Sequence, residues 1–504
     1  MTISKRAEYP SVAHLIDELL PAHSKARVLF PSFNQWPFSV AAWVDIAAVL
    51  HAGGSQIFIA PWAQLTPLAD VGRTTEKWVN TVLRTHDADA GAVQALKAFG
   101  VPLNQFLQPT VLTSPMEPIE IPASLTRAAV RALTYRGSPM GKAMLQVTPE
   151  RNTPMSEAFN WPRAWVEASA YSYAFVYDNV RAAIEEHCIT SVVVYNGRFL
   201  HDQAARAAAI DAGIPVIYYD ASGTETDYEL TSHDIHDWSA LQKRMLTMYE
   251  NWPVEEREEL GSRWFEDRIS HADPHNRRFI DAQVSGEVPR KSSDEVWVVY
   301  FSSSGDEIIE LNIDWSDYFG SQRQALALVA EEVRKMANHK LIVRSHPHKR
   351  HKPPLDVAEW LQDVEDAQPD LHLPPESPVD SYALMRLADV VVTYGSTSGV
   401  EAGYAGKPVI VMGPSAYDEL GCAVRVRTQE ELTSALENKS VGSKDGALAY
   451  GLMAVRRGVH YAYVEKAPTG NFQLAGVPID QAAERARHLS HAIRTRRMSK
   501  LIQK

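Results

Sequence analysis

The sequence predicts an α/β protein with parallel sheets, organised as two large domains. Short apolar runs of strand length recur along the chain, and each is followed by a polar or glycine-containing turn and then by a helical pattern. At 504 residues the chain can form two large domains or three small ones. The hydrophobic fraction of 45% and the charged fraction of 22% are ordinary for a globular protein.

A β-α-β unit is expected at the start of the first domain. Residues 27–30 read as a strand, 38–50 as an apolar-rich helix and 56–60 as the next strand. Such a unit, with the usual right-handed crossover, begins a Rossmann-like domain. The further elements expected in this half are helical segments with proline-containing loops over 62–120, a polar linker or lid over 149–162, a helix at 163–187, a strand at 191–195, a helix at 202–212 and a strand at 215–219.

Global features favour a soluble, cytoplasmic protein. No apolar stretch is long enough to span a membrane, and the N-terminus carries no apolar signal core. The net charge of −12 argues against broad nucleic-acid binding. Cys188 and Cys422 lie far apart and show no metal-ligand spacing, so we expect two buried thiols in a reducing compartment.

The stretch from 388 to 402 carries the strongest indication of function. Residues 390–392 form an apolar strand, and the tight turn at 394–399 leads into a helix. A helix start of this kind offers backbone N–H groups and hydroxyls to an anion. The hydroxyl candidates are Ser396, Thr397 and Ser398. Glu401, in the first helical turn, can reach a sugar hydroxyl beside that anion, and a phosphate beside a ribose describes a nucleotide. The alternative is that the serines only cap the helix and Glu401 complements its dipole.

Two other predicted strands end in similar polar turns. The apolar runs at 296–301 and 340–343 are both followed by small hydroxylic, basic or imidazole residues. The binding candidates at these turns are Ser303, Ser304, Arg344 and His346. In an open α/β sheet ligands bind at the carboxyl ends of the strands, where such loops converge. The alternative for His346 is a strand-end histidine paired with a carbonyl, and the following Pro347 fits either reading.

The combination of His346-Pro347 with the downstream Ser396-Thr397-Ser398 resembles the C-terminal half of GT-B glycosyltransferases. More narrowly, it resembles bacterial enzymes that build capsule and lipopolysaccharide chains. Transferases that use CMP-activated Kdo or sialic acid carry a His-Pro motif and a Ser-rich motif, both on the nucleotide. The resemblance is good over residues 290–420 and weak over 190–240. A Ser-Gly turn followed by a helical Glu is also found in UDP-sugar transferases and epimerases.

This resemblance implies a GT-B fold, in which two Rossmann-like domains face each other across a cleft and a C-terminal helix crosses back. The expected domains are 1–285 for the acceptor, 286–470 for the nucleotide sugar, and 471–504 as a basic helix on the N-terminal domain. The basic residues of that helix are Arg485, Arg487, Arg494, Arg496, Arg497, Lys500 and Lys504. The alternative is that this helix contacts anionic lipid at the inner membrane.

Transfer without a metal ion is expected. GT-B enzymes stabilise the leaving phosphate with helix N-termini and with cationic or hydrogen-bonding side chains, and His346, Arg344 and the serine turn fill those places here. Asp87-Ala88-Asp89 is the one tempting Asp-x-Asp sequence, but no apolar strand precedes it, so it reads as a loop or helix cap. The basic segment that holds His348, Lys349, Arg350, His351 and Lys352 reads as a solvated loop. No cofactor is expected.

The general base must come from the acceptor side of the site. Asp220, at the end of the strand 215–219, is the first choice and Glu225 the second, although both can be turn formers only. Asn34, Asn196 and Arg198 follow other strands of the same half and are candidates for binding the acceptor. Asp380 reads as the N-cap of a helix whose Tyr382 can face the donor.

The sequence therefore predicts a glycosyltransferase that moves a sugar from a nucleotide donor, with CMP-Kdo-like sugars favoured, to a surface-polysaccharide or lipid-linked glycan. Three rivals stay open: a CDP-glycerol glycerophosphotransferase, a UDP-sugar 2-epimerase, and an inert nucleotide-binding scaffold of a polysaccharide assembly complex.

Overall fold

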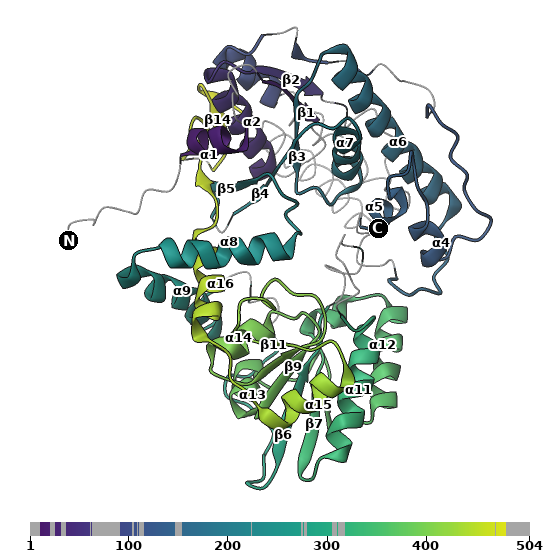
Figure 1. The fold of residues 1–504 in the computed structure, drawn as a ribbon, viewed down its shortest axis with the longest axis vertical. Helices are drawn as coiled ribbons and strands as arrows, with labels where there is room; N and C mark the ends of the chain where they lie inside the picture. The colour runs from purple at the N-terminus through teal and green to yellow at the C-terminus, as the bar shows by residue number, and fades with distance from the viewer. Residues whose placement is uncertain are drawn as a thin grey trace, which may run out of the picture. The chain divides into compact units, whose positions relative to one another are not determined.

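The computed structural model describes residues 11–20, 26–31, 37–60, 62, 91–102, 105–107, 109, 115–146, 154–222, 224–273, 276, 280–304, 310, 318–468 and 470–479 (Figure 1). The chain divides into two compact units. The first unit draws on 1–147, 160–235 and 457–504, and the second on 148–159 and 236–456. Each unit has its own sheet.

The first unit contains a six-stranded sheet in the order β12-β5-β4-β3-β1-β2. Four neighbouring strands are parallel; at one edge β5 pairs antiparallel with β4, and β12 pairs antiparallel with β5. The strands are β1 (Arg27–Pro31), β2 (Gln56–Ala60), β3 (Ser191–Tyr195), β4 (Val216–Ala221), β5 (Asp227–Thr231) and β12 (Val459–His460). The labelled helices are α1 (Val12–Leu19), α2 (Pro37–Ala52), α4 (Arg127–Arg131), α5 (Met140–Gln146), α6 (Arg163–Glu186) and α7 (Leu200–Asp211), and residues 91–99 are helical as well. The predicted β-α-β unit is confirmed as β1, α2 and β2.

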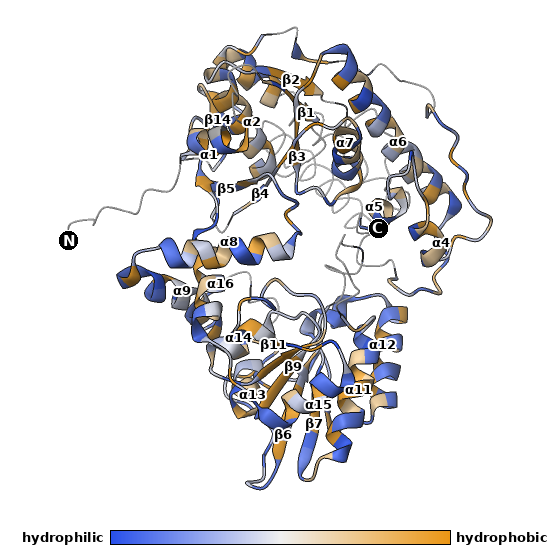
Figure 2. Cartoon of the chain, in the orientation of Figure 1, coloured by the Kyte–Doolittle hydropathy of each residue, from blue (hydrophilic) through white to orange (hydrophobic). Residues whose placement is uncertain are grey.

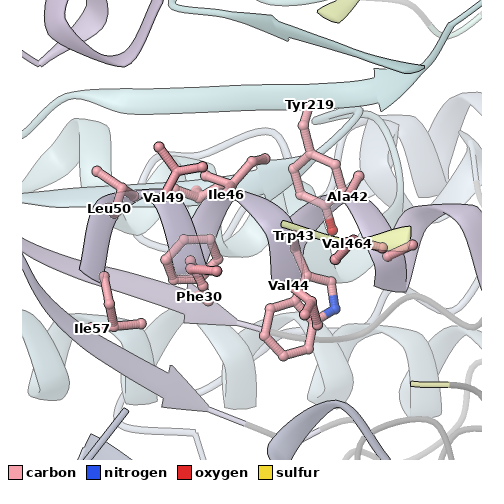
Figure 3. Close-up of a cluster of buried hydrophobic side chains, with 14 of the residues drawn as sticks. Phe30, Ala42, Trp43, Val44, Ile46, Val49, Leu50, Ile57, Tyr219 and Val464 are labelled. Carbon is pink, nitrogen blue, oxygen red and sulfur yellow. The ribbon is translucent and has the colours of Figure 1, made fainter. Parts of the chain in front are cut away.

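Helix α2 lies inside the core of the first unit. Every side chain from Ser39 to Leu50 is buried, which explains why the helix is apolar around its circumference. Figure 3 shows Trp43 and Ile46 of α2 packed with Phe30 of β1 and Tyr219 of β4. Burial of this kind contributes roughly 1.5–3 kcal/mol for each large apolar side chain.

A buried carboxylate in α2 ties down a segment from the end of the chain. Asp45 accepts hydrogen bonds from the backbone N–H groups of Ala462, Tyr463 and Val464 at 3.0, 2.7 and 2.9 Å, and from the Tyr228 hydroxyl at 3.0 Å. Burial raises the pKa of the Asp45 carboxyl, and these donors counteract that rise. The carboxylate therefore satisfies backbone groups that have no strand partner.

The segment held by Asp45 is the described part of the C-terminal region, 457–479. It contributes β12 to the main sheet and forms a small antiparallel sheet of β13 (Glu465–Lys466), β14 (Phe472–Leu474) and β15 (Val477–Pro478). The chain thus joins the first unit before residue 471, and strands stand at 472–478, where the sequence analysis began a basic helix. Residues 480–504, with all the arginines and lysines expected in that helix, lie outside the described residues.

The second unit contains a six-stranded sheet in which all strands are parallel, in the order β11-β10-β9-β6-β7-β8. Its strands are β6 (Val296–Phe301), β7 (His339–Arg344), β8 (Leu371–Leu373), β9 (Val390–Thr393), β10 (Val409–Val411) and β11 (Val424–Arg425). Its helices are α8 (Trp238–Asn251), α9 (Val254–Ile269), α11 (Gln322–Lys335), α12 (Pro354–Ala367), α13 (Ser381–Leu387), α14 (Ser398–Tyr404), α15 (Gln429–Asn438) and α16 (Lys444–Arg456), with the 3-10 helix η3 (Pro347–His351). Figure 2 shows apolar strands in this sheet, with helices of mixed polarity around it. Both units are therefore Rossmann-like α/β folds, and the strands predicted at 296–301, 340–343 and 390–392 are confirmed.

The division between the units falls earlier than the boundary expected at 286. Helices α8 and α9 belong to the second unit because both pack against α16. Gly261 of α9 and Gly451 of α16 allow that approach, since a Cβ atom at either position would collide with the backbone of the partner helix. Because α9 and α16 are far apart in the sequence, no local sequence pattern predicts that they pack together or that the division falls before α8.

Two expectations about single features can also be checked. Cys422 is a buried free thiol, as expected, but Cys188 is an exposed free thiol, so that part of the expectation is wrong. Within the described part of the chain, no helix combines the length and the apolar character that crossing a bilayer requires.

Candidate functional site

A cavity of about 460 Å³ opens in the second unit at the carboxyl ends of β6 and β7, beside the starts of α13 and α14. Its lining includes residues from all three turns that the sequence analysis singled out. The lining residues are Arg268, Asn276, Ile280, Gln283, Phe301, Ser302, Ser304, Arg344, Ser345, His346, Pro347, His348, Ser381, Tyr382, Met385, Thr397, Ser398 and Glu401. The convergence follows from the parallel sheet, because β9, β6 and β7 are neighbours and end on the same edge.

The turn after β6 presents Ser302 and Ser304 to the cavity, whereas the predicted Ser303 is not part of the lining. Ser302 also fixes the neighbouring loop, because its hydroxyl accepts a hydrogen bond from the His346 backbone N–H at 2.8 Å. The backbone N–H of Ser303 donates to Gln322 Oε1 at 2.5 Å. Because side chains alternate along an extended chain, the cavity receives Ser304, which was predicted, and Ser302 in place of the predicted Ser303.

Arg344, the last residue of β7, contributes a buried guanidinium to the cavity wall. Only 1% of the residue is exposed, and its hydrogen bonds go to the carbonyl oxygens of Pro374 at 2.6 Å and Ser377 at 3.5 Å and to the Ser381 hydroxyl at 3.4 Å. Burial lowers the pKa of this guanidinium to about 10. All three acceptors are neutral. Glu376 acts on the guanidinium electrostatically and raises its pKa, but among the described residues no carboxylate forms an ion pair with Arg344.

His346 begins η3 and has a defined tautomer. Its Nδ1 atom accepts a hydrogen bond from the backbone N–H of His348 at 3.1 Å, as the N-cap of that short helix. A neutral imidazole whose Nδ1 accepts must carry its proton on Nε2. His346 therefore enters the cavity wall as a hydrogen-bond donor, which is the role a phosphate oxygen requires.

The basic segment after His346 is more ordered than the predicted solvated loop. Lys349 is buried with its Nζ atom 4.3 Å from the centre of the Trp360 ring, and Arg350 forms an ion pair with Asp281 at 2.5 Å. Among the described residues no group of three or more His, Cys, Asp or Glu side chains is placed to hold a metal ion. Asp87 and Asp89 lie outside the described residues.

In the serine turn before α14, some residues line the cavity and one is buried and supports the turn. Thr397 and Ser398 line the cavity, whereas Ser396 is buried beneath them and its hydroxyl accepts from the Ser398 backbone N–H at 3.4 Å. The Ser396 carbonyl accepts a hydrogen bond from the Tyr417 hydroxyl at 2.5 Å. Gly399 has to be glycine, because a Cβ atom there would collide with that hydroxyl. Of the three predicted hydroxyls, two therefore reach the cavity directly.

Glu401 reaches the cavity from the first turns of α14 but is already partly engaged. Its Oε1 atom accepts from Arg268 Nε at 2.6 Å and from the Tyr382 hydroxyl at 3.1 Å. Tyr382 is placed by its own helix start, since Asp380 caps α13 and accepts from the Tyr382 backbone N–H at 2.8 Å. Asp380 is thus the N-cap that the sequence predicted.

The sequence reasoning missed Arg268, Asn276 and Ser345. Arg268 and Asn276 come from the region around and after α9, far from the strands that build the sheet edge, and no motif marks them. Ser345 stands inside a recognised turn, but its hydroxyl faces inward, within hydrogen-bond distance of Trp360 Nε1 at 2.7 Å and of His372 Nε2 at 2.8 Å. The sequence did offer a signal for Ser345, because this residue stands between the last residue of a strand, Arg344, and the His346-Pro347 pair.

The acceptor-side candidates belong to the first unit. Asn196 and Asp220 stand at the ends of the adjacent strands β3 and β4, and the Asn196 amide donates to the Asp220 carboxylate. Asn196 has a positive φ of 51° and the following Gly197 a φ of 77°, a turn that brings the amide back over the strand end. The structure thus brings together two residues that the sequence named separately.

The other acceptor-side candidates are placed differently. Glu225 is 80% exposed and forms an ion pair with Lys466, which lowers the pKa of the carboxyl. A carboxylate held in this way is a weaker base than an ordinary one, so Asp220 stays the better candidate. The guanidinium of Arg198 lies 5.3 Å from the centre of the Phe199 ring. Asn34 lies outside the described residues.

Comparison with protein families gives a match over the part of the chain that builds this cavity. Residues 287–444 match the family of capsule polysaccharide biosynthesis proteins. The match confirms the resemblance to capsule enzymes expected from the sequence. It begins after α9, so Arg268 lies outside the matched segment. A search of curated protein sequences finds no match.

Comparison with solved structures returns distant likenesses. One is a β-Kdo 2,4 transferase, KpsC of Thermosulfurimonas dismutans, at 16% identity over 55% of this chain and 80% of that chain, with a TM-score of 0.34. A second is the β-Kdo 2,7 transferase KpsC of the same organism, at 14% identity over 62% and 89%, with a TM-score of 0.35. A third is UDP-GlcNAc 2-epimerase from Neisseria meningitidis, at 12% identity over 86% and 97%, with a TM-score of 0.27. At these identities and scores the likenesses assign no activity.

Proposed function

We propose that this protein is a glycosyltransferase of capsule polysaccharide synthesis whose second unit binds the nucleotide-activated sugar. The observation that carries the proposal is the buried Arg344 guanidinium on the wall of the cavity, which has only neutral hydrogen-bond acceptors. A buried charge is costly unless an opposite charge compensates it. A phosphate group in the cavity supplies that compensation.

The groups around Arg344 suit a phosphate in detail. Ser302, Ser304, Thr397 and Ser398 bring hydroxyls, and His346 brings an imidazole whose proton is on Nε2. Glu401, at the same cavity, suits the hydroxyl groups of a sugar such as ribose. Phosphate-binding donors beside a carboxylate are what a nucleotide requires, and the family match over 287–444 supports a donor used in capsule synthesis.

In this proposal the reaction is a displacement at the anomeric carbon of the donor sugar. The bond between that carbon and the phosphate oxygen breaks, and its electron pair passes to the phosphate, where Arg344 and His346 stabilise the negative charge. The acceptor hydroxyl forms the new bond and gives its proton to Asp220 of the first unit.

Three finer points belong to the same proposal. The donor is a CMP-linked, Kdo-like sugar, because the His-Pro and Ser-rich motifs resemble those of CMP-dependent transferases. The acceptor is a surface polysaccharide or a lipid-linked glycan, which Asn196 and Arg198 help to bind. The reaction takes place on the cytoplasmic side of the inner membrane. The basic C-terminal residues contact the anionic lipid of that membrane peripherally. The leaving phosphate needs no metal ion.

A transfer assay tests the proposal. Purified protein is mixed with CMP-Kdo and a capsule oligosaccharide, and free CMP and the extended oligosaccharide are measured together. The proposal predicts that CMP release depends on the acceptor and falls with Asp220→Ala. Isomerisation of a UDP-sugar without an acceptor would identify an epimerase instead. Transfer of glycerol phosphate from CDP-glycerol would identify a glycerophosphotransferase, and nucleotide binding without turnover of any donor would identify an inert scaffold.

A further inference from the structure

Glu401 forms an ion pair on the cavity wall with Arg268, a residue that has no role in the proposed function. Arg268, in the last turn of α9, donates from Nε to Glu401 Oε1 at 2.6 Å. The Tyr382 hydroxyl donates to the same oxygen at 3.1 Å. Within the described part of the chain, both bonds fall on Oε1, and no donor is found for Oε2. One carboxylate oxygen is therefore held by the protein while the residue lines the cavity.

The guanidinium that holds Glu401 is itself fixed by two other contacts. Its Nη1 atom donates to Asp273 at 3.2 Å, and its central carbon lies 4.5 Å from the centre of the Trp264 ring, one helical turn earlier on α9. Burial acts to lower the pKa of Arg268, but Glu401, Tyr382 and Tyr450 together outweigh it and raise the pKa above its ordinary value. Arg268 therefore stays charged and in one orientation.

The second donor to Glu401 is part of a chain of hydrogen bonds. Asn276 donates a hydrogen bond from its side-chain amide to the Tyr382 hydroxyl at 2.9 Å. The Tyr382 hydroxyl in turn donates a hydrogen bond to Glu401 Oε1. Chains of this kind polarise one another, so each bond strengthens the next. The carboxylate thus has two donors on one oxygen, from α9 and from α13, and cannot turn freely.

We infer that Arg268 is a positioning residue that aims Glu401 Oε2 at a ribose hydroxyl of the bound nucleotide. The inference rests on the proposed function, because it takes the ligand of the cavity to be a nucleotide. A buried ion pair is a weak source of stability compared with apolar packing, so its presence on a cavity wall needs another reason. Orientation of Glu401, the carboxylate among the lining residues, supplies that reason. Arg268, which provides this orientation, lies outside the segment that matches the capsule family.

The test measures how strongly the protein distinguishes ribose hydroxyls. Affinities for CMP and for 2′,3′-dideoxy-CMP are measured by calorimetry with the full chain, using UDP and its dideoxy form if the protein selects uridine. The variants are Arg268→Gln, Tyr382→Phe and Glu401→Gln. The control is Arg263→Gln, on the same helix, whose exposed side chain pairs only with Glu259 in the described structure. Melting temperatures check that each variant is folded.

The wild type and the Arg263→Gln control should bind the ribonucleotide roughly tenfold or more tightly than the dideoxy form, because a hydrogen bond to a charged group is lost with the hydroxyls. Arg268→Gln and Glu401→Gln should bring that ratio close to one while affinity for the dideoxy form changes little. Equal weakening of both ligands by Arg268→Gln would overturn the inference, because it would leave Arg268 a structural role only. A wild type that binds both forms equally would overturn it too, although the nucleotide site would stand. A wild type that binds no nucleotide would overturn the proposed function as well.

Discussion

The Nδ1 atom of His346 accepts a hydrogen bond from the backbone N–H of His348 at 3.1 Å. This bond does two things at once: it caps η3 and it fixes the imidazole proton on Nε2. In its neutral form the imidazole at the end of β7 thereby presents an N–H donor from Nε2. That property connects the local turn to the proposed stabilisation of a leaving phosphate.

Substitution of His346 should separate catalysis from folding. His346→Ala is expected to lower kcat by about 10²–10³-fold, the usual effect of removing one donor to a developing negative charge. The lost cap should cost only about 1 kcal/mol of unfolding free energy. His339→Ala, at the half-buried opposite end of β7, is the matched control and should leave kcat unchanged. A parallel loss of melting temperature and activity in His346→Ala would assign the residue a structural role only.

The serine turn should respond to the loss of its buried support. Tyr417→Phe removes the donor to the Ser396 carbonyl and the contact with the Thr393 hydroxyl at 3.0 Å, so we expect a loss of about 1–3 kcal/mol in unfolding free energy and a raised KM for the donor. Tyr249→Phe removes a hydroxyl that bonds Asp445 elsewhere in the second unit and serves as the control. It should lower stability without raising KM. An unchanged KM in Tyr417→Phe would mean that the turn does not depend on this clamp.

Local sequence was sufficient to predict strands β6, β7 and β9 and the three polar turns that meet at the cavity edge. Strands such as β6 and β9 are continuous apolar runs because both faces are covered, and polar residues follow them because the ligand edge is there. The prediction of Asp380 as an N-cap is also confirmed, because a cap depends only on the two or three residues that follow it. Features that depend on a single alternation, such as Ser302 in place of Ser303, were missed by one residue.

The remaining features depend on contacts between distant segments. Arg268 meets Glu401, and Asp45 meets Val464, across separations that no motif records. The assignment of α8 and α9 to the second unit depends on α16, and the small sheet at 465–478 depends on packing against α2 within the first unit. Such pairings are decided by tertiary packing and not by local propensity.

Asp45 should be critical for attaching the C-terminal segment. Asp45→Asn removes the charge and leaves one oxygen to accept from the backbone N–H groups of 462–464, while its N–H₂ meets the Tyr228 hydroxyl that donates to Oδ2, so we expect the unfolding free energy to fall by about 1–3 kcal/mol. Tyr228→Phe removes only one donor and should cost about 1 kcal/mol. Denaturant titration measures both changes, and limited proteolysis should cut first within 457–479 in Asp45→Asn. Equal stability of Asp45→Asn and wild type would contradict the role given to this carboxylate.

His201 of α7 should make the first unit sensitive to acid. Burial of its Nε2 atom lowers the pKa of the ring from 6.5 to about 4, so the folded state prefers the neutral form. The corresponding stability is present above pH 6.5 and is lost as the pH falls towards 4, by up to about 3 kcal/mol. His201→Gln should lack this part of the pH dependence. Thermal melts of both proteins between pH 7 and pH 4 check it, and curves of the same slope would show that His201 does not contribute.

Chelation tests the expectation that no metal ion is needed. Turnover measured after dialysis against EDTA should equal turnover in untreated protein, because Arg344, His346 and the hydroxyls of the cavity are proposed to stabilise the leaving phosphate. Addition of Mg²⁺ or Mn²⁺ should change the rate little. Activity that disappears with EDTA and returns with a divalent ion would contradict this mechanism.

The central claim is that the cavity of the second unit is a nucleotide site, and calorimetric titration with CMP, CDP, UDP and GDP tests it most directly. Wild-type protein should bind a cytidine nucleotide selectively, and His346→Ala should weaken that binding by roughly tenfold or more. Selective binding of UDP would keep the site but change the donor. Absence of binding by all four nucleotides, in protein that melts cooperatively, would contradict the account.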